Sequence, residues 1–116
     1  MSYKKVIATI TLLLAISVGL LAQTAKSETV KIKTSAVCSQ CKERIEKGLA
    51  FEKGIKDVDL DVMTKIATVR YNPLKTTPDA IRRAISKLGY DADEVKADPK
   101  AYEKLPKCCK KDTVKH

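Results

Sequence analysis

The segment TVKIKTSAVCSQC, residues 29–41, decides how this chain folds, because it joins a strand to a helix through a short loop. Residues 29–34 alternate apolar and polar side chains, which predicts a strand with one buried face. A loop follows, and Ser39 suits the N-cap of a helix. The segment therefore predicts a strand–loop–helix unit with one cysteine in the loop, Cys38, and another in the first helical turn, Cys41.

The first predicted helix continues from this unit over Gln40–Lys53. Its apolar residues recur at helical spacing with charges between them, so we expect one buried face, formed by Cys41, Ile45 and Leu49. Gly54 suits the end of the helix, because glycine readily adopts the left-handed conformation that is common there.

Two further strands and a second helix are predicted downstream. Alternation over Ile55–Val62 and apolar character over Ile66–Tyr71 indicate two strands joined as a β-hairpin. Thr77, Pro78 and Asp79 then supply a cap, a proline at the first helical position and an acid near the positive end of the helix dipole. The buried stripe of this helix is expected to consist of Ile81, Ala84, Ile85 and Leu88, with Gly89 ending it.

A short fourth strand is expected at Asp93–Ala97, which completes a βαββαβ order. Strands with one apolar face and helices with one apolar face suit a two-layer packing. We therefore predict an α+β, ferredoxin-like sandwich, with a four-stranded antiparallel sheet and two helices on one face. This domain is expected to span residues 28–97, followed by a Lys-rich tail over residues 98–116 with a helical turn at Ala101–Leu105.

The first 22 residues have the three parts of a secretory signal peptide. Lys4 and Lys5 form a basic start, Val6–Ala22 carries no charge, and small residues follow. The apolar stretch is shorter than the roughly 20 residues of a typical membrane-spanning helix. We expect cleavage after Ala22, or else after Ala25, and a periplasmic or secreted protein; an uncleaved membrane anchor is the alternative.

The composition of the 116 residues excludes several classes of function. The only histidine is His116, at the last position, so a Ser–His–Asp triad has no internal base and a His-rich metal site is ruled out. One Phe and no Trp are too few aromatic residues for a base-stacking surface, and an exported chain is not expected to bind nucleic acid. The net charge of +9 reflects surface lysines that would steer an acidic partner.

Four cysteines lie in two tight clusters, Cys38/Cys41 and Cys108/Cys109. Disulfides that hold a fold together usually close long loops, whereas clustered cysteines more often bind metal or do redox chemistry. A helix N-terminus stabilises thiolate over thiol, and thiolates favour soft ions. Because Zn(II) usually takes four ligands, the two sulfurs of Cys38 and Cys41 suit two-coordinate Cu(I) or Hg(II) better.

A wider pattern surrounds the first cysteine pair. It comprises Thr34–Cys41, Ile45, Leu49, Gly54, Ile55, Val58, Val62, Ala67–Pro73 and Ala84–Tyr90. In this pattern the chain resembles the heavy-metal-associated domain family over about residues 28–97, and with its predicted signal peptide it looks like the secreted members that stand alone. The resemblance implies a βαββαβ metal-binding or metal-handover domain with Cys38 and Cys41 as its two ligands.

The chain departs from the family motif Gly-Met-x-Cys-x-x-Cys, because Ser35 and Ala36 stand at the Gly and Met positions. That Met packs beneath the loop in the family and does not bind the ion, so both ligands are retained. Tyr90 matches the aromatic residue that the family often places beside the metal loop. In the predicted topology the second helix ends near that loop, so Tyr90 is expected to support the site, or else to be an aromatic residue at the edge of the core.

The tail cysteines are not explained by the resemblance. A fourth strand would run away from the metal end, so the tail is expected to start at the far side of the domain. The 11 residues from Ala97 to Cys108 can span about 36 Å when extended, against about 20 Å for a strand. We therefore expect Cys108 and Cys109 to fold back as auxiliary ligands, which would admit Zn(II) or Cd(II); the alternative is a tail whose thiols are oxidised or cross-linked.

Two functions remain open at this point. The first is a non-enzymatic carrier or buffer of a soft metal ion outside the cytoplasm, which would pass its ion to a metal-transporting membrane protein or another thiolate acceptor. We expect it to be a monomer, with a metal-bridged dimer as the alternative. The second is a thiol–disulfide oxidoreductase that uses Cys38 and Cys41, because C-x-x-C at a helix N-terminus is also the thioredoxin arrangement.

Overall fold

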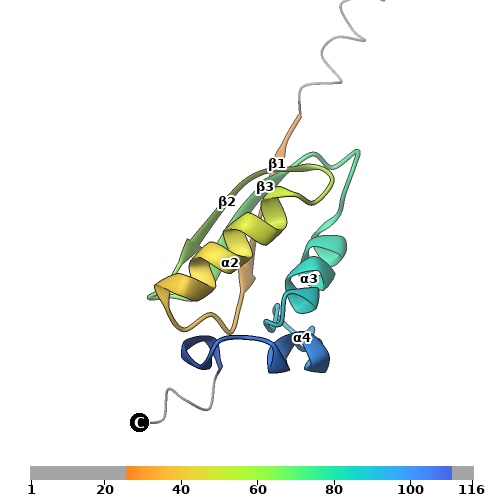
Figure 1. Ribbon diagram of the computed structural model, residues 1–116. Coiled ribbons are helices and arrows are strands. Elements are labelled where there is room, and N and C mark those ends of the chain that lie inside the picture. Colours follow the sequence, from red (N-terminus) through yellow and green to blue (C-terminus); the bar gives the residue numbers. More distant parts are fainter. Residues whose placement is uncertain (1–25, 111–116) are drawn as a thin grey trace, which may run out of the picture.

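The computed structural model describes residues 26–110 (Figure 1). The predicted signal peptide, residues 1–22, and His116 lie outside these described residues. No helix within residues 26–110 is both long enough and apolar enough to cross a membrane.

Three antiparallel strands form the sheet: β1 (Glu28–Lys33), β2 (Ile55–Asp61) and β3 (Ile66–Tyr71). Their order is β1-β3-β2, so β3 is the central strand. Val69 of β3 pairs with Val30 on one side and with Val58 on the other, which places one valine of each strand in the same row across the sheet. The predicted hairpin is confirmed by the pairing of β2 with β3.

Both long helices, α2 (Ser39–Ala50) and α3 (Pro78–Lys87), lie on the same face of the sheet (Figure 1). At the start of α3 the Ala80 N–H donates to Thr77 Oγ1 at 3.2 Å, so the predicted cap forms. The N-cap of α2 is Cys38, where the sequence predicted Ser39. Helix α2 also ends at Ala50, before the predicted Lys53. The apolar face of the helix stops at Leu49, because Phe51, the next large apolar residue, is 90% exposed and does not pack on the sheet.

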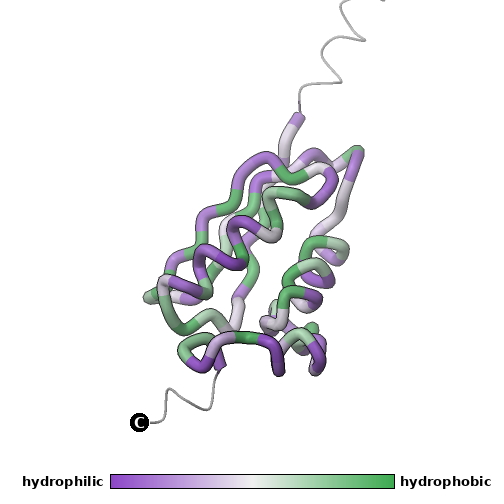
Figure 2. Tube along the Cα trace, in the orientation of Figure 1, coloured by the Kyte–Doolittle hydropathy of each residue, from purple (hydrophilic) through white to green (hydrophobic). Residues whose placement is uncertain are grey.

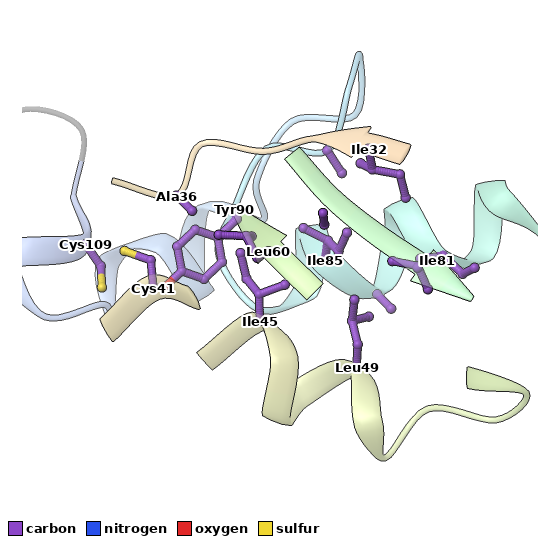
Figure 3. Close-up of a cluster of buried hydrophobic side chains, with 14 of the residues drawn as sticks. Ile32, Ala36, Cys41, Ile45, Leu49, Leu60, Ile81, Ile85, Tyr90 and Cys109 are labelled. Carbon is purple, nitrogen blue, oxygen red and sulfur yellow. The ribbon is translucent and has the colours of Figure 1, made fainter. Parts of the chain in front are cut away.

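The core lies between the helices and the sheet, and its side chains meet there (Figure 3). Ile45 and Leu49 of α2, Ile81 and Ile85 of α3 and Ile32 of β1 are each at most 1% exposed. Hydrophobic and hydrophilic residues alternate along the strands and helices, as one buried face requires (Figure 2). Leu88, predicted for the core, is only half-buried at the end of α3.

The predicted fourth strand at Asp93–Ala97 does not form, and the sheet of the described residues has three strands. Only isolated bridges occur there, Thr34 with Ala92 and Ala92 with Val95. The reason lies in Asp93, whose carboxylate accepts the Lys33 N–H at 2.9 Å and Arg82 Nε at 2.8 Å. The Lys33 N–H at the edge of β1 would have bonded a fourth strand, but the Asp93 carboxylate accepts it instead. In addition, the positive φ of Asp93, 51°, turns the chain away from β1.

After this turn the chain forms a short helix, α4 (Pro99–Glu103), and a single turn of 3₁₀-helix, η1 (Lys107–Cys109). Both lie at the end of the molecule where the loop enters α2 (Figure 1), and η1 contacts α2. The expectation that the tail starts at the far side of the domain is therefore wrong. Without a fourth strand to carry it away, the chain stays at the cysteine end.

Candidate metal centre

Four cysteine sulfurs converge at the start of α2, although they come from two distant parts of the chain. The Sγ atoms of Cys38 and Cys41 lie 3.3 Å apart. Cys109 Sγ lies 3.7 Å from Cys38 Sγ and 3.9 Å from Cys108 Sγ. The sulfurs of Cys38, Cys108 and Cys109 all lie within 4.8 Å of one another. All four cysteines are free thiols.

The loop that carries Cys38 is held by short side-chain bonds. Thr34 Oγ1 donates to the Lys65 carbonyl at 2.8 Å and accepts the Ala36 N–H at 3.2 Å. The hydroxyl of Ser35 accepts the Asp91 N–H at 2.9 Å, and Ala36 is fully buried. Ser35 and Ala36 are the two positions at which the sequence departs from the family motif. Ser35 connects the loop to Asp91 by a hydrogen bond, and Ala36 packs beneath the loop.

Cys38 and Cys41 differ in exposure. Cys41 is fully buried on the apolar face of α2, in line with Ile45, whereas Cys38 is half-buried in the loop. Burial by itself would raise the pKa of the Cys38 thiol, but the backbone N–H and the thiol of Cys41 lower it from 9.0 to about 7. Cys38 is therefore a thiolate in a large fraction of molecules at neutral pH, as a cysteine at a helix N-terminus should be.

The two tail cysteines also differ from each other. Cys109 is 1% exposed, and this burial, followed by the nearby Cys41 thiol, raises its pKa well above the usual range. Cys108 is exposed and its thiol donates to Gln40 Oε1 of α2 at 2.5 Å. The pKa of Cys108 is raised as well, by partial desolvation and then by the thiol of Cys38. As the pH rises in the metal-free protein, Cys38 therefore loses its proton before Cys108 and Cys109 do.

Tyr90 lies next to the sulfurs, at the end of the domain where the predicted topology placed it, and Figure 3 shows its ring beside Cys41 and Ala36. The ring is fully buried, and its hydroxyl has no hydrogen-bond partner among the described residues. Burial raises the pKa of the Tyr90 hydroxyl, and the neighbouring sulfurs of Cys109 and Cys41 raise it further. The hydroxyl is therefore a proton donor held next to the sulfur cluster.

The tail is anchored by features that sequence reasoning did not use. Asp98 caps α4 by accepting the Ala101 N–H at 3.0 Å. Gly89, at φ 104°, lets α4 approach closely, since a Cβ there would lie 3.0 Å from the Ala101 backbone. Leu105, the only leucine in the Lys-rich tail, is 5% exposed and belongs to the main core. That lone leucine was the signal that could have placed the tail on the domain.

Among the described residues, the sulfurs of Cys38, Cys108 and Cys109 form one group of possible ligands, Cys41 Sγ lies 3.3 Å from Cys38 Sγ, and no nitrogen or carboxylate ligand belongs to the group. Thiolates prefer Cu(I), Zn(II) and heavier d¹⁰ ions, so the donor set suits this class of metal. The sequence predicted Cys38 and Cys41 at one site, and the structure brings them together with Cys108 and Cys109.

Residues 29–91 match the family model of the heavy-metal-associated domain, which is more than half of the chain. The chain is 36% identical over 78 residues to a copper-exporting P-type ATPase of Staphylococcus saprophyticus. That match covers 67% of this chain and 9% of the ATPase, so the chain spans about a tenth of the length of such curated relatives. Cys108 and Cys109 lie beyond the region that matches the family.

Solved structures are similar over the same part of the chain. The oxidized MerP of Ralstonia metallidurans has a TM-score of 0.56 at 25% identity, covering 59% of this chain and 96% of its own. The water-soluble region of the P-type ATPase CopA from Bacillus subtilis has a TM-score of 0.55 at 34% identity, covering 58% of this chain and 45% of its own.

Proposed function

This chain belongs to the heavy-metal-associated domain family, and from that premise we propose that it carries or buffers a soft metal ion, Cu(I) or Hg(II), by thiolate ligand exchange at Cys38 and Cys41. The observation that carries the proposal is the pair of sulfurs 3.3 Å apart at the N-terminus of α2. The names of the relatives, which are copper-exporting ATPases, support copper as the cargo.

The unequal exposure of the two ligands suits an exchange mechanism. Cys38 is the more accessible sulfur and its pKa of about 7 keeps it available as a thiolate. A partner thiolate adds to the ion on this side, and Cys38 then leaves, while buried Cys41 holds the ion throughout. The ion passes between proteins without being released to water, and no covalent bond of a substrate changes, so we propose a non-enzymatic role.

We propose that the partner is a metal-transporting membrane protein or another thiolate acceptor, and that the chain is periplasmic or secreted after removal of residues 1–22. Removal of residues 1–22 takes away Lys4 and Lys5 and no acidic residue, so the net charge falls from +9 to +7, and this positive charge favours an acidic partner surface. No nucleic-acid role is proposed, and we expect a monomer unless an ion bridges two copies.

The test is a Cu(I) and Hg(II) titration of the reduced full chain under anaerobic conditions, against a competing chelator. Cys38→Ser and Cys41→Ser should each weaken binding by orders of magnitude. Ser39→Ala, between them and exposed, is the matched control and should bind like the unaltered chain. If both cysteine variants keep full affinity for both ions, the proposed site is wrong.

A second candidate, a thiol–disulfide oxidoreductase, is favoured by one observation: Cys38 has the lowered pKa of an attacking thiol and Cys41 is close enough to resolve it. Cys38 would attack a substrate disulfide and expel one thiol. Cys41 would then displace the second thiol and leave a Cys38–Cys41 disulfide. A disulfide-reduction assay with a protein disulfide substrate and dithiothreitol decides between the two, because turnover above the dithiothreitol background is expected only for the oxidoreductase.

A further inference from the structure

We propose that Cys108 and Cys109 complete a four-thiolate site with Cys38 and Cys41, and that this site takes a divalent d¹⁰ cation such as Cd(II) or Zn(II). The inference rests on the proposed function, since it requires Cys38 and Cys41 to be ligands. It adds the coordination number, a second class of ion and a role for the tail, whose cysteines lie outside the family match.

The sulfur spacing fits four-coordination better than two-coordination. With a metal–sulfur bond of about 2.3 Å, tetrahedral geometry separates two sulfurs by roughly 3.8 Å and linear geometry by roughly 4.6 Å. Cys109 Sγ lies 3.7 Å from Cys38 Sγ and 3.9 Å from Cys108 Sγ, which are close to the tetrahedral value. Cys38 and Cys41, at 3.3 Å, need to separate by only a fraction of an ångström for a tetrahedral ion.

The tail sulfurs are held in place before any ion binds. Leu105 and Cys109 are both buried in the main core, and η1 contacts α2. Hydrophobic packing therefore already offsets much of the entropy that closing the loop between the two cysteine pairs would otherwise require. Cys108 Sγ already lies within 4.8 Å of the sulfurs of Cys38 and Cys109, and a rotation of its exposed side chain would turn the thiol from Gln40 towards an ion.

An independent observation also indicates that the sulfurs of this site become negatively charged thiolates. The hydroxyl of Tyr90 is fully buried beside Cys41 and Cys109 and has no partner among the described residues. An unsatisfied buried hydroxyl is costly, and metal-bound thiolates are strong acceptors that would satisfy it. Lys107 and Lys110 flank the tail cysteines in sequence, and Lys110 also pairs with Glu103 at 3.9 Å. The positive charge of these lysines partly offsets the two negative charges that four thiolates leave around a divalent ion.

The four-thiolate site changes what the protein can do with its cargo. An ion enclosed by the sulfurs of Cys38 and Cys41 and by the two tail sulfurs offers no open position, so a partner thiolate must first displace a tail ligand. Cys108 is the sulfur placed to leave, because it is exposed while Cys109 and Cys41 are buried. The tail thus favours retention of divalent ions, and it leaves a two-coordinate ion free to bind Cys38 and Cys41 alone.

The experiment measures Cd(II) affinity by competition and the sulfur count by X-ray absorption on the reduced full chain. We expect four sulfurs in the unaltered protein, three in Cys108→Ser, and two in Cys108→Ser/Cys109→Ser with Cd(II) affinity at least about 100-fold weaker. Cu(I) affinity of the double variant should change less than about 10-fold, because Cu(I) is satisfied by two sulfurs.

Leu105→Asp is the matched variant that keeps all four thiols but removes the anchor of the tail. It should lower the sulfur count and the Cd(II) affinity like the double serine variant, while its Cu(I) affinity is retained. Two sulfurs in the unaltered protein, or equal Cd(II) affinity with and without the tail thiols, would overturn the four-thiolate site and leave the proposed function standing. Failure of the proposed function is seen separately, as unchanged Cu(I) and Hg(II) binding in Cys38→Ser and Cys41→Ser.

Discussion

The Sγ atoms of Cys38 and Cys109 lie 3.7 Å apart although 71 positions separate the two residues in the sequence. One belongs to the loop that characterises the family, and the other to a tail that the family match does not include. Their contact makes the tail part of the metal end of the domain. The following predictions test the chemistry of this end and the packing that maintains it.

Alkylation of the metal-free, reduced protein should follow the unequal acidity of its thiols. The thiolate is the reactive form, so the rate at Cys38 should rise with pH and reach half its maximum near pH 7. Cys109 should stay unmodified until well above pH 9, because burial raises its pKa. Iodoacetamide pulses at several pH values, read by peptide mass spectrometry, give both profiles. A midpoint for Cys38 at the ordinary value of 9.0 would contradict the effect of the Cys41 N–H.

Leu49→Ala should lower the free energy of unfolding by about 2–5 kcal/mol, because the side chain is fully buried between α2 and the sheet. Urea titration followed by circular dichroism measures the loss. Phe51→Ala, two residues along and 90% exposed, is the matched control and should cost less than about 0.5 kcal/mol. A loss below 1 kcal/mol for the leucine variant would mean that this face of α2 does not carry the stability of the core.

Tyr90→Phe should have opposite effects on the empty and the loaded protein. Removing a buried hydroxyl without a partner should leave the metal-free fold as stable or raise its stability by about 1 kcal/mol. The loaded protein should lose a hydrogen bond to thiolate, so Cd(II) and Cu(I) affinities should fall by a few-fold. Thermal melts with and without metal measure both effects. Equal changes in the two states would show that the hydroxyl does not interact with the bound ion.

Gly89→Ala should loosen the tail. The residue has φ 104°, and an added Cβ would lie 3.0 Å from the backbone of Ala101, so α4 has to move outward. We expect a loss of about 1–3 kcal/mol in stability and faster alkylation of Cys109 at pH 9. Lys100→Ala, an exposed position of the same helix, serves as the control, since it leaves Gly89 and its close approach to Ala101 untouched. Unchanged protection of Cys109 in Gly89→Ala would show that the tail does not depend on this close approach.

Most of the secondary structure was predictable because it depends on neighbours in sequence. The alternation of β1, the hairpin of β2 and β3, the cap at Thr77 and the buried face of α2 follow from local spacing, and each is present as predicted. The errors occurred where a distant group decided the outcome. Asp93 looked like the first residue of a strand, but its carboxylate bonds the Lys33 N–H and Arg82, and neither partner can be identified from the residues beside it.

The sequence by itself determined the chemistry of this protein: a C-x-x-C pair at a strand–helix junction, a second pair of cysteines in a basic tail, and an apolar pattern sufficient for two helices packed on a sheet. Only the tertiary structure decided that the two pairs share one site. The missing fourth strand keeps the tail at the metal end, and Leu105 binds it to the core. Local spacing determines which side chains share one face of a helix or strand. Cys38 and Cys109, 71 positions apart, come together only because core packing and hydrogen bonds at the sheet edge direct the path of the chain between them.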